Sequence, residues 1–177
     1  MCALSAIGCH VLYVAPGPNP LSGRRVFAVQ QVSYDGLVVG NKPQEQYEAQ
    51  KSDASAGSFE ADKAESAALF TQQLAHRLTN AGLQLAGGPG PGVVIVVPHV
   101  VHYEPGIYTY VYNRATTVLL QVSFLDESGQ PIAQDQFRVG VPANLGNPSS
   151  GGRFRQAMLE LANHVGGYLV RRVNSPP

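Results

Sequence analysis

Tryptophan is absent from this chain of 177 residues, both cysteines lie within its first nine residues, and neither sign of charge predominates. Lys plus Arg number 12, and Asp plus Glu also number 12. Binding to the phosphates of nucleic acid needs clustered Lys and Arg, so this balance argues against a nucleic-acid partner. No run of 18 apolar residues follows Cys9, so no membrane-spanning helix is expected. The length suits one domain with a sizeable core.

The residues around the second cysteine form a pattern. Leu4-Ser-Ala-Ile7 is apolar or small, Gly8 is small, and Cys9 follows. This order is typical of the end of a bacterial lipoprotein signal peptide, where the cysteine after the cleavage site is acylated. We therefore expect residues 1–9 to be the remnant of a signal peptide and Cys9 to carry a lipid anchor such as palmitate.

A second interpretation of this terminus stays open. A signal peptide normally has a basic segment and about 7–15 apolar residues before the cleavage site. Only eight residues precede Cys9, and none of them is Lys or Arg. Either the true start lies upstream of Met1, or Cys9 is an ordinary cysteine in a frayed terminus.

The next segment, residues 10–24, contains three prolines and two glycines. This composition predicts an extended tether that holds the following domain away from a membrane surface. We expect one domain over residues 25–173 and a short tail at residues 174–177.

Four segments predict strands. Residues 25–34, 116–125 and 132–141 alternate apolar and polar positions, and the last two form a hairpin. Residues 93–101 are almost continuously apolar, as expected of a strand buried on both faces. Within that run Pro98 predicts an edge position or a bulge, because proline cannot donate a ladder hydrogen bond.

Two segments predict helices, because apolar residues recur at steps of three and four. They are residues 61–81 and 153–173, and we expect the two glycines at 166–167 to let the second helix lie close to the sheet. Residues 35–60 are polar and irregular, which predicts a mobile loop with a short helical turn near residues 44–50. The order β-α-β-β-β-α predicts an α+β fold, with two helices on one side of a mostly antiparallel sheet.

The segment Val101-His-Tyr-Glu-Pro-Gly106, the strand at residues 116–124 and the turn Leu125-Asp-Glu-Ser-Gly129 resemble a group of uncharacterised bacterial lipoproteins. The layout is also similar to that of PelC-like outer-membrane lipoproteins of polysaccharide export and of the N-terminal domain of TolB. The resemblance implies a periplasmic, non-enzymatic domain and is compatible with an oligomer.

No chemistry of catalysis or metal binding stands out. His99 and His102 are three apart on a predicted strand, so their rings point to opposite faces unless a bulge intervenes, and no cysteine cluster completes a site. A Gly-x-Ser-x-Gly nucleophile motif is absent, and Asp126 and Glu127 are adjacent in a solvated turn. We therefore expect no metal, no cofactor and no enzymatic activity.

Tyrosines are concentrated in one stretch, at Tyr103, Tyr108, Tyr110 and Tyr112, and the last three would share one face of an extended segment. Tyrosine is enriched at interfaces because it combines a large apolar area with a polar tip. Three interpretations stay open: packing on a neighbouring subunit, stacking on a sugar, and ordinary cross-strand pairs in a sheet.

These features together predict a non-enzymatic lipoprotein of the bacterial cell envelope. It would be anchored at the outer membrane through Cys9, face the periplasm, and assist envelope assembly or export by binding other envelope proteins or copies of itself. The alternative is a soluble periplasmic domain that binds a ligand such as a glycan through the face of Tyr108, Tyr110 and Tyr112.

Overall fold

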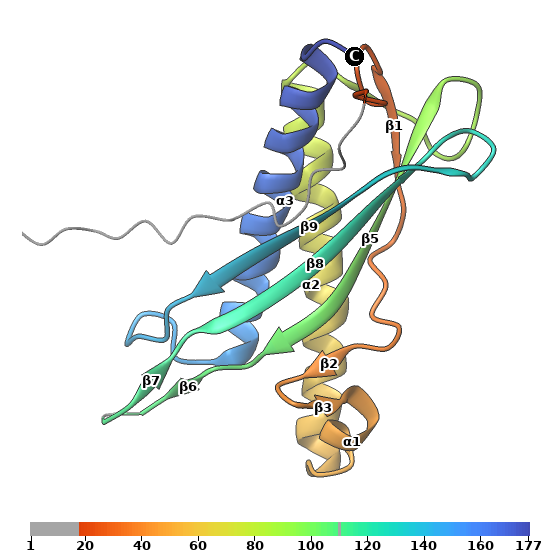
Figure 1. Cartoon of the computed structure of the whole chain (residues 1–177). Helices are drawn as coiled ribbons and strands as arrows, with labels where there is room; N and C mark the ends of the chain where they lie inside the picture. The colour runs from red at the N-terminus through yellow and green to blue at the C-terminus, as the bar shows by residue number, and fades with distance from the viewer. Residues whose placement is uncertain (1–17, 110) are drawn as a thin grey trace, which may run out of the picture.

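A long central strand, β5, organises the computed structural model, which describes residues 18–109 and 111–177 (Figure 1). The strands of the described chain are β1 Val26–Val29, β2 Val38–Val39, β3 Lys42–Pro43, β4 Gln84–Leu85, β5 Val93–Glu104, β6 Ile107–Tyr108, β7 Asn113–Arg114, β8 Thr116–Leu125 and β9 Pro131–Val141. The helices of the same residues are α1 Gln44–Glu48, α2 Asp53–Asn80 and α3 Ser150–Asn174.

The main sheet has seven strands among the described residues. On one side β5 pairs antiparallel with β8 along most of its length, and β8 pairs antiparallel with β9. On the other side β1 runs parallel to the first part of β5, while β2 runs parallel to its end. Most residue pairs are therefore antiparallel. The α+β class and the order of the main elements, β1, α2, β5, β8, β9 and α3, are confirmed.

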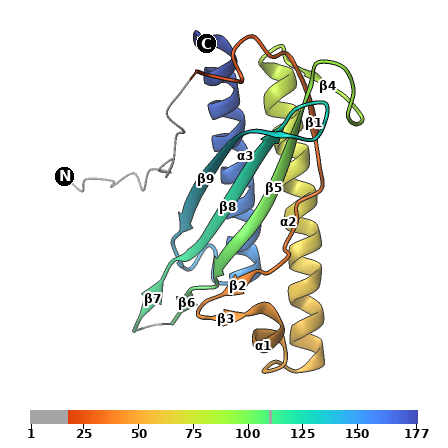
Figure 2. The same ribbon diagram turned by 45° about the vertical axis from the view of Figure 1, so that its right-hand side comes forward.

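Both long helices cover the same face of the sheet and run side by side in the same direction (Figures 1 and 2). Arg155 of α3 lies beside Asp62 of α2, and further along Gly166 lies beside Arg77. A Cβ at Gly166 would lie 2.5 Å from Cγ of Arg77, so only glycine allows this approach. The prediction that the glycine pair brings α3 close to the sheet is thus corrected, because Gly166 brings α3 close to α2.

The core fills the space between these helices and the sheet. On β8 the inward positions Val118, Leu120, Val122 and Phe124 are fully buried, as the alternation predicted. The predicted stripes of both helices are confirmed at all but one position by burial of the residues that form them, which are Ala67, Phe70, Leu74, Leu78, Phe154, Met158, Leu161, Val165 and Leu169. The exception is Ala81, the predicted end of the α2 stripe, which is exposed because the helix already ends at Asn80.

The polar segment at residues 35–60 is ordered into short elements rather than one mobile loop. The predicted helical turn is confirmed by α1, but α2 begins at Asp53, eight residues before the predicted start. Ser52 caps this helix by accepting a hydrogen bond from the Ser55 N–H at 3.4 Å. The first turns of α2 are mostly polar, so they show no apolar stripe before Phe59.

The first strand is shorter than predicted because of a proline on its partner. Gln30 donates its N–H to the Val96 carbonyl at 2.9 Å, and the next rung of a parallel ladder would need an N–H at Pro98. Proline has none, so β1 ends at Val29 and the chain rejoins β5 only at Ser33. Pro98 therefore marks the end of a neighbouring strand, and the bulge of β5 lies elsewhere.

The segment before β1 is packed on the domain. Asn19 donates its side-chain N–H to the Arg172 carbonyl at 2.7 Å, and Gly23 donates its backbone N–H to the Val173 carbonyl at 3.0 Å. Leu21 is completely buried and belongs to the core. The prediction of a free tether is therefore wrong for residues 19–23. Cys9 lies outside the described residues, and within those residues no helix is long and apolar enough to cross a membrane.

Candidate interaction site

The hairpin of β6 and β7 projects from one end of the sheet, near the start of α3 (Figures 1 and 2). Large apolar side chains are exposed there: Ile107 is 43% exposed, Val111 98%, Tyr112 58%, and Leu145 of the neighbouring loop 82%. These are four of the five large exposed apolar side chains within the described chain. We refer to these four residues, together with Tyr108, as the hairpin surface.

A hollow of about 360 Å³ lies between the hairpin and the loop that follows β9. It is lined by Tyr108, Thr109, Asn113, Asn144 and Leu145. The tip of the hairpin is held by Thr109, whose hydroxyl donates to the Tyr112 carbonyl at 2.7 Å. The volume of the hollow is within the usual range of ligand pockets, and its lining combines the aromatic ring of Tyr108 with the amide groups of Asn113 and Asn144.

The base of the hairpin is fixed by Glu104 and Gly106, which belong to the segment at residues 101–106. Glu104 forms an ion pair with Arg114 across the hairpin, and the hydrogen bond from that guanidinium is the main cause that lowers the pKa of Glu104. Gly106 has a φ of +69°, and a Cβ there would lie 2.4 Å from the Arg114 carbonyl oxygen. A side chain at this position is therefore excluded both by the backbone conformation and by the space.

A buried cation joins the hairpin base to α3. Arg153 is 1% exposed and donates from Nε to the Thr116 hydroxyl at 2.8 Å and from Nη2 to the Pro105 carbonyl at 3.0 Å. Its Nη1 donates to the carbonyls of Asn147, at 3.1 Å, and Pro148. Within the described chain no carboxylate pairs with it, and burial lowers the pKa of Arg153. One side chain thus orders both segments that flank the hollow.

The four predicted tyrosines differ in burial, and the shared face of Tyr108, Tyr110 and Tyr112 stays a prediction. Tyr108 is half-buried, Tyr112 is exposed, and Tyr110 lies outside the described residues. Tyr103 is 2% exposed, with its ring 4.5 Å from that of Phe154 between centroids. The prediction of a surface position is therefore wrong for Tyr103, which belongs to the core.

A bulge in β5 between Val100 and His102 explains this difference. It shifts the alternation by one residue, so that Val100 and Tyr103 both face the helices, and His99 and His102 both face the open side. The exception stated for this pair, a bulge between the two histidines, is therefore present, and the two rings lie on the same side of the sheet.

Each imidazole contacts a carbonyl of the segment around β2. His99 Nε2 lies 2.7 Å from the Asp35 carbonyl oxygen, and His102 Nε2 lies 2.9 Å from that of Gly40. Within residues 18–109 and 111–177, no three His, Cys, Asp or Glu side chains gather closely enough to hold a metal ion. The two histidines therefore fasten a loop to the sheet.

The architecture defines an α+β domain with one helix layer. No protein-family model and no curated protein sequence matches the chain. It is similar to solved structures of a Xanthomonas campestris protein of the DUF330 family (TM-score 0.48, 14% identity, 88% of this chain and 90% of that chain) and of a minor lipoprotein from Acinetobacter baumannii (TM-score 0.44, 13% identity, 84% and 94%).

A third similar structure is the PelC dodecamer from Paraburkholderia phytofirmans, with a TM-score of 0.43 and 10% identity over 88% of this chain and 94% of that chain. The predicted similarity in layout to uncharacterised and PelC-like lipoproteins is confirmed by these structures. At such identities the similarity concerns the fold alone.

Proposed function

We propose that this protein is a lipoprotein of the bacterial envelope, anchored at the outer membrane through Cys9 and facing the periplasm. Its hairpin surface binds a protein partner, either another envelope protein or a second copy, and so assists envelope assembly or export. The observation that carries the proposal is the arrangement of the domain, because Asn19 is bound at one end and the hairpin surface lies at the other.

The opposite positions of Asn19 and the hairpin follow from contacts at the two ends of the long helices. Asn19 is bound to the last turn of α3, whereas the hairpin lies near the first turn of that helix (Figure 2). The parallel helix α2 has 28 residues and so extends over about 40 Å. A domain anchored through the segment before Asn19 therefore presents its hairpin about that far from the anchored end.

The hairpin surface has the composition expected of a protein contact. Val111 and Leu145 expose most of their apolar area, and burying such a side chain contributes about 1.5–3 kcal/mol. Tyr112 adds an aromatic ring of the kind that often dominates binding energy. The ion pair of Glu104 with Arg114 and the hydrogen bonds of Arg153 hold the base of this surface in place before a partner binds. This order limits the entropic cost of association.

The anchor is tested by the intact mass of the protein in the membrane fraction, after expression with its native upstream region. We expect the wild-type mass to correspond to a chain that begins at Cys9 and carries acyl groups. Cys9→Ser should be found unacylated and outside the membrane fraction, whereas the matched control Cys2→Ser should behave as wild type. An unmodified wild-type chain beginning at Met1 in the soluble fraction would contradict the proposed anchor.

The hairpin surface is tested by introducing charge. In the double variant Val111→Asp and Leu145→Asp, we expect partner affinity to fall at least tenfold for each substitution. The reason is that a carboxylate replaces apolar area that the partner buries in the complex. The measurement is the yield of cross-links from a photoreactive residue at Tyr112 in intact cells.

The matched control for this experiment is Leu85→Asp, which introduces the same charge at an exposed apolar residue outside the hairpin surface. Equal cross-linking in the double variant and in the wild type would show that the hairpin surface does not carry the interaction.

Ligand binding in the hollow is the second candidate function. Tyr108 offers a ring for stacking, and Asn113 and Asn144 offer amides that hydrogen-bond hydroxyl groups, as a glycan site requires. Saturable binding of oligosaccharides in calorimetry, lost in Tyr108→Ala but retained in Val111→Asp, a residue outside the lining of the hollow, would favour this candidate over a protein partner.

A further inference from the structure

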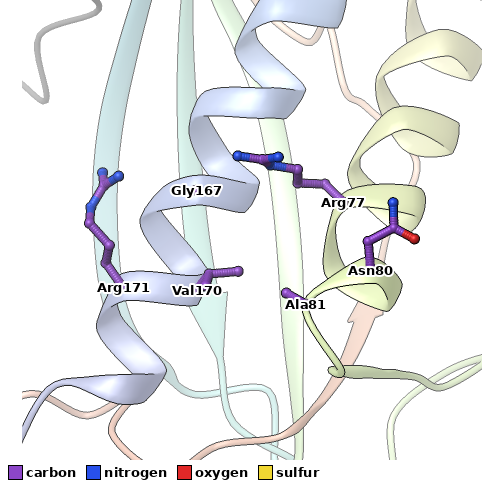
Figure 3. A pocket seen from close by; sticks show the side chains of 6 residues that line it. All are labelled: Arg77, Asn80, Ala81, Gly167, Val170 and Arg171. Carbon is purple, nitrogen blue, oxygen red and sulfur yellow. The ribbon is translucent and has the colours of Figure 1, made fainter.

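A second pocket lies away from the hairpin, between the C-terminal parts of α2 and α3 (Figure 3). Its volume is about 360 Å³, and its lining residues are Arg77, Asn80, Ala81, Gly167, Val170 and Arg171. Figure 3 shows Arg77 reaching from α2 towards α3, while Arg171 extends along α3, so that the two guanidinium groups flank Gly167 in this view.

The pocket has an excess of positive charge. Among the described residues neither Arg77 nor Arg171 forms an ion pair. The parallel helices both end nearby, and each C-terminal end contributes roughly half a negative charge. Two arginines therefore outweigh about one negative charge. Arg172 is not included in this balance, because it interacts with the buried carboxylate of Asp135.

The glycine pair of α3 gives an independent indication. Glycine inside a helix is unfavourable relative to alanine, so two in succession call for a reason. Gly166 is explained by the stem of Arg77, which packs against it. Gly167 has no such constraint, because a Cβ there would meet only Nη1 of Arg171, at the ordinary contact distance of 3.6 Å. What Gly167 does is leave the floor of the pocket open between the two guanidinium groups.

We propose that this pocket binds a phosphate group through Arg77 and Arg171. The planar guanidinium matches the oxygens of phosphate and holds them with paired hydrogen bonds. The pocket adjoins the last turns of α3, to which Asn19 is bound, so it lies at the end where the chain enters. The phosphate has two sources, the free ion or a phospholipid headgroup beneath the anchored protein, and only the second source rests on the proposed function.

The test of the pocket is an NMR titration of the full chain, carrying Cys9→Ser, with inorganic phosphate at constant ionic strength. We expect saturable shifts of the Gly167 amide and of the Arg77 and Arg171 side-chain N–H signals. Arg77→Gln and Arg171→Gln should each weaken binding at least fivefold. The matched control is Arg138→Gln, which removes the same charge from the exposed side of β9 and should bind as wild type.

Gly167→Ala separates the pocket from general charge effects. Alanine should raise the midpoint of thermal unfolding, because it favours the helix, yet weaken phosphate binding by filling the floor of the pocket. Unchanged binding in this variant, or equal weakening in Arg138→Gln, would overturn the proposed site.

Vesicles of phosphatidylcholine, with and without phosphatidylglycerol, distinguish the two sources. Cosedimentation that needs phosphatidylglycerol, Arg77 and Arg171 identifies a lipid headgroup as the ligand. Phosphate shifts without cosedimentation identify the free ion, and the absence of both overturns the proposal. Acylation of Cys9 is measured separately by mass, so failure of the anchor and failure of the pocket are told apart.

Discussion

Replacing Arg153 by methionine is expected to destabilise the domain by about 2–4 kcal/mol, because several buried or partly buried hydrogen-bond acceptors lose their donor at once. The Pro105 carbonyl keeps only the Thr116 hydroxyl, at 2.6 Å. The carbonyls of Asn147 and Pro148 lose the donor that joins them to α3. Methionine fills similar space but donates no hydrogen bond.

The predicted loss is unequal across the molecule. The hairpin base and the loop at residues 144–148 are joined through this guanidinium, whereas the far ends of α2 and α3 are not. Amide hydrogen exchange should therefore accelerate most in β6, β7 and that loop. Partner binding should weaken with it, because the hairpin surface is then no longer held in one arrangement.

The measurement is urea unfolding followed by circular dichroism for wild type, Arg153→Met, Arg153→Lys and Arg138→Met. Lysine keeps the charge but cannot reproduce the fork of donors, so it should recover only part of the loss. Arg138 is exposed on β9, and its replacement should change the free energy of unfolding by less than about 0.5 kcal/mol. Equal stability of the Arg153→Met and Arg138→Met variants would contradict the role assigned to Arg153.

The sequence predicts the main elements because burial in this fold follows simple periods. On β8 every second residue is buried, and the adjacent turn contains Asp126, whose carboxylate accepts from the N–H groups of Ser128 and Gln130. A local pattern with a local turn is visible in one sequence. The same holds for the stripes of α2 and α3.

The bulge of β5 is invisible for the opposite reason. It lies in a run of almost continuous valines, where no alternation marks the shift of one residue. The burial of Tyr103 and the position of both histidines on the same side of the sheet follow from that single shift.

The candidate site is only partly predictable. The tyrosine pattern includes Tyr108 and Tyr112 of the hairpin surface, although it does not predict the hairpin itself. It does not indicate Leu145 or Arg153, because their roles depend on a loop and a helix more than 30 residues later in the sequence. A buried arginine has no sequence signal of its own, since most arginines are exposed.

Replacing Tyr103 by alanine is the second substitution with a large expected effect, a destabilisation of about 3–5 kcal/mol. The ring stacks on that of Phe59 at 5.8 Å and lies 4.5 Å from that of Phe154, so its removal leaves a cavity where α2 and α3 meet the sheet. The hydroxyl matters less, because its hydrogen bond to the Ser150 carbonyl is long, at 3.3 Å. Tyr103→Phe should therefore cost less than about 1 kcal/mol.

Tyr112→Ala is the matched comparison, because it removes the same side chain from a position that is 58% exposed. Its free energy of unfolding should change by less than about 0.5 kcal/mol, while its yield of partner cross-links from a photoreactive residue at Val111 falls. The two tyrosines thus separate stability from binding, since Tyr103 acts through the core and Tyr112 through the hairpin surface. Wild-type stability of Tyr103→Ala together with lost cross-links would place Tyr103 on the interface. That result would contradict the bulge of β5, which turns Tyr103 into the core.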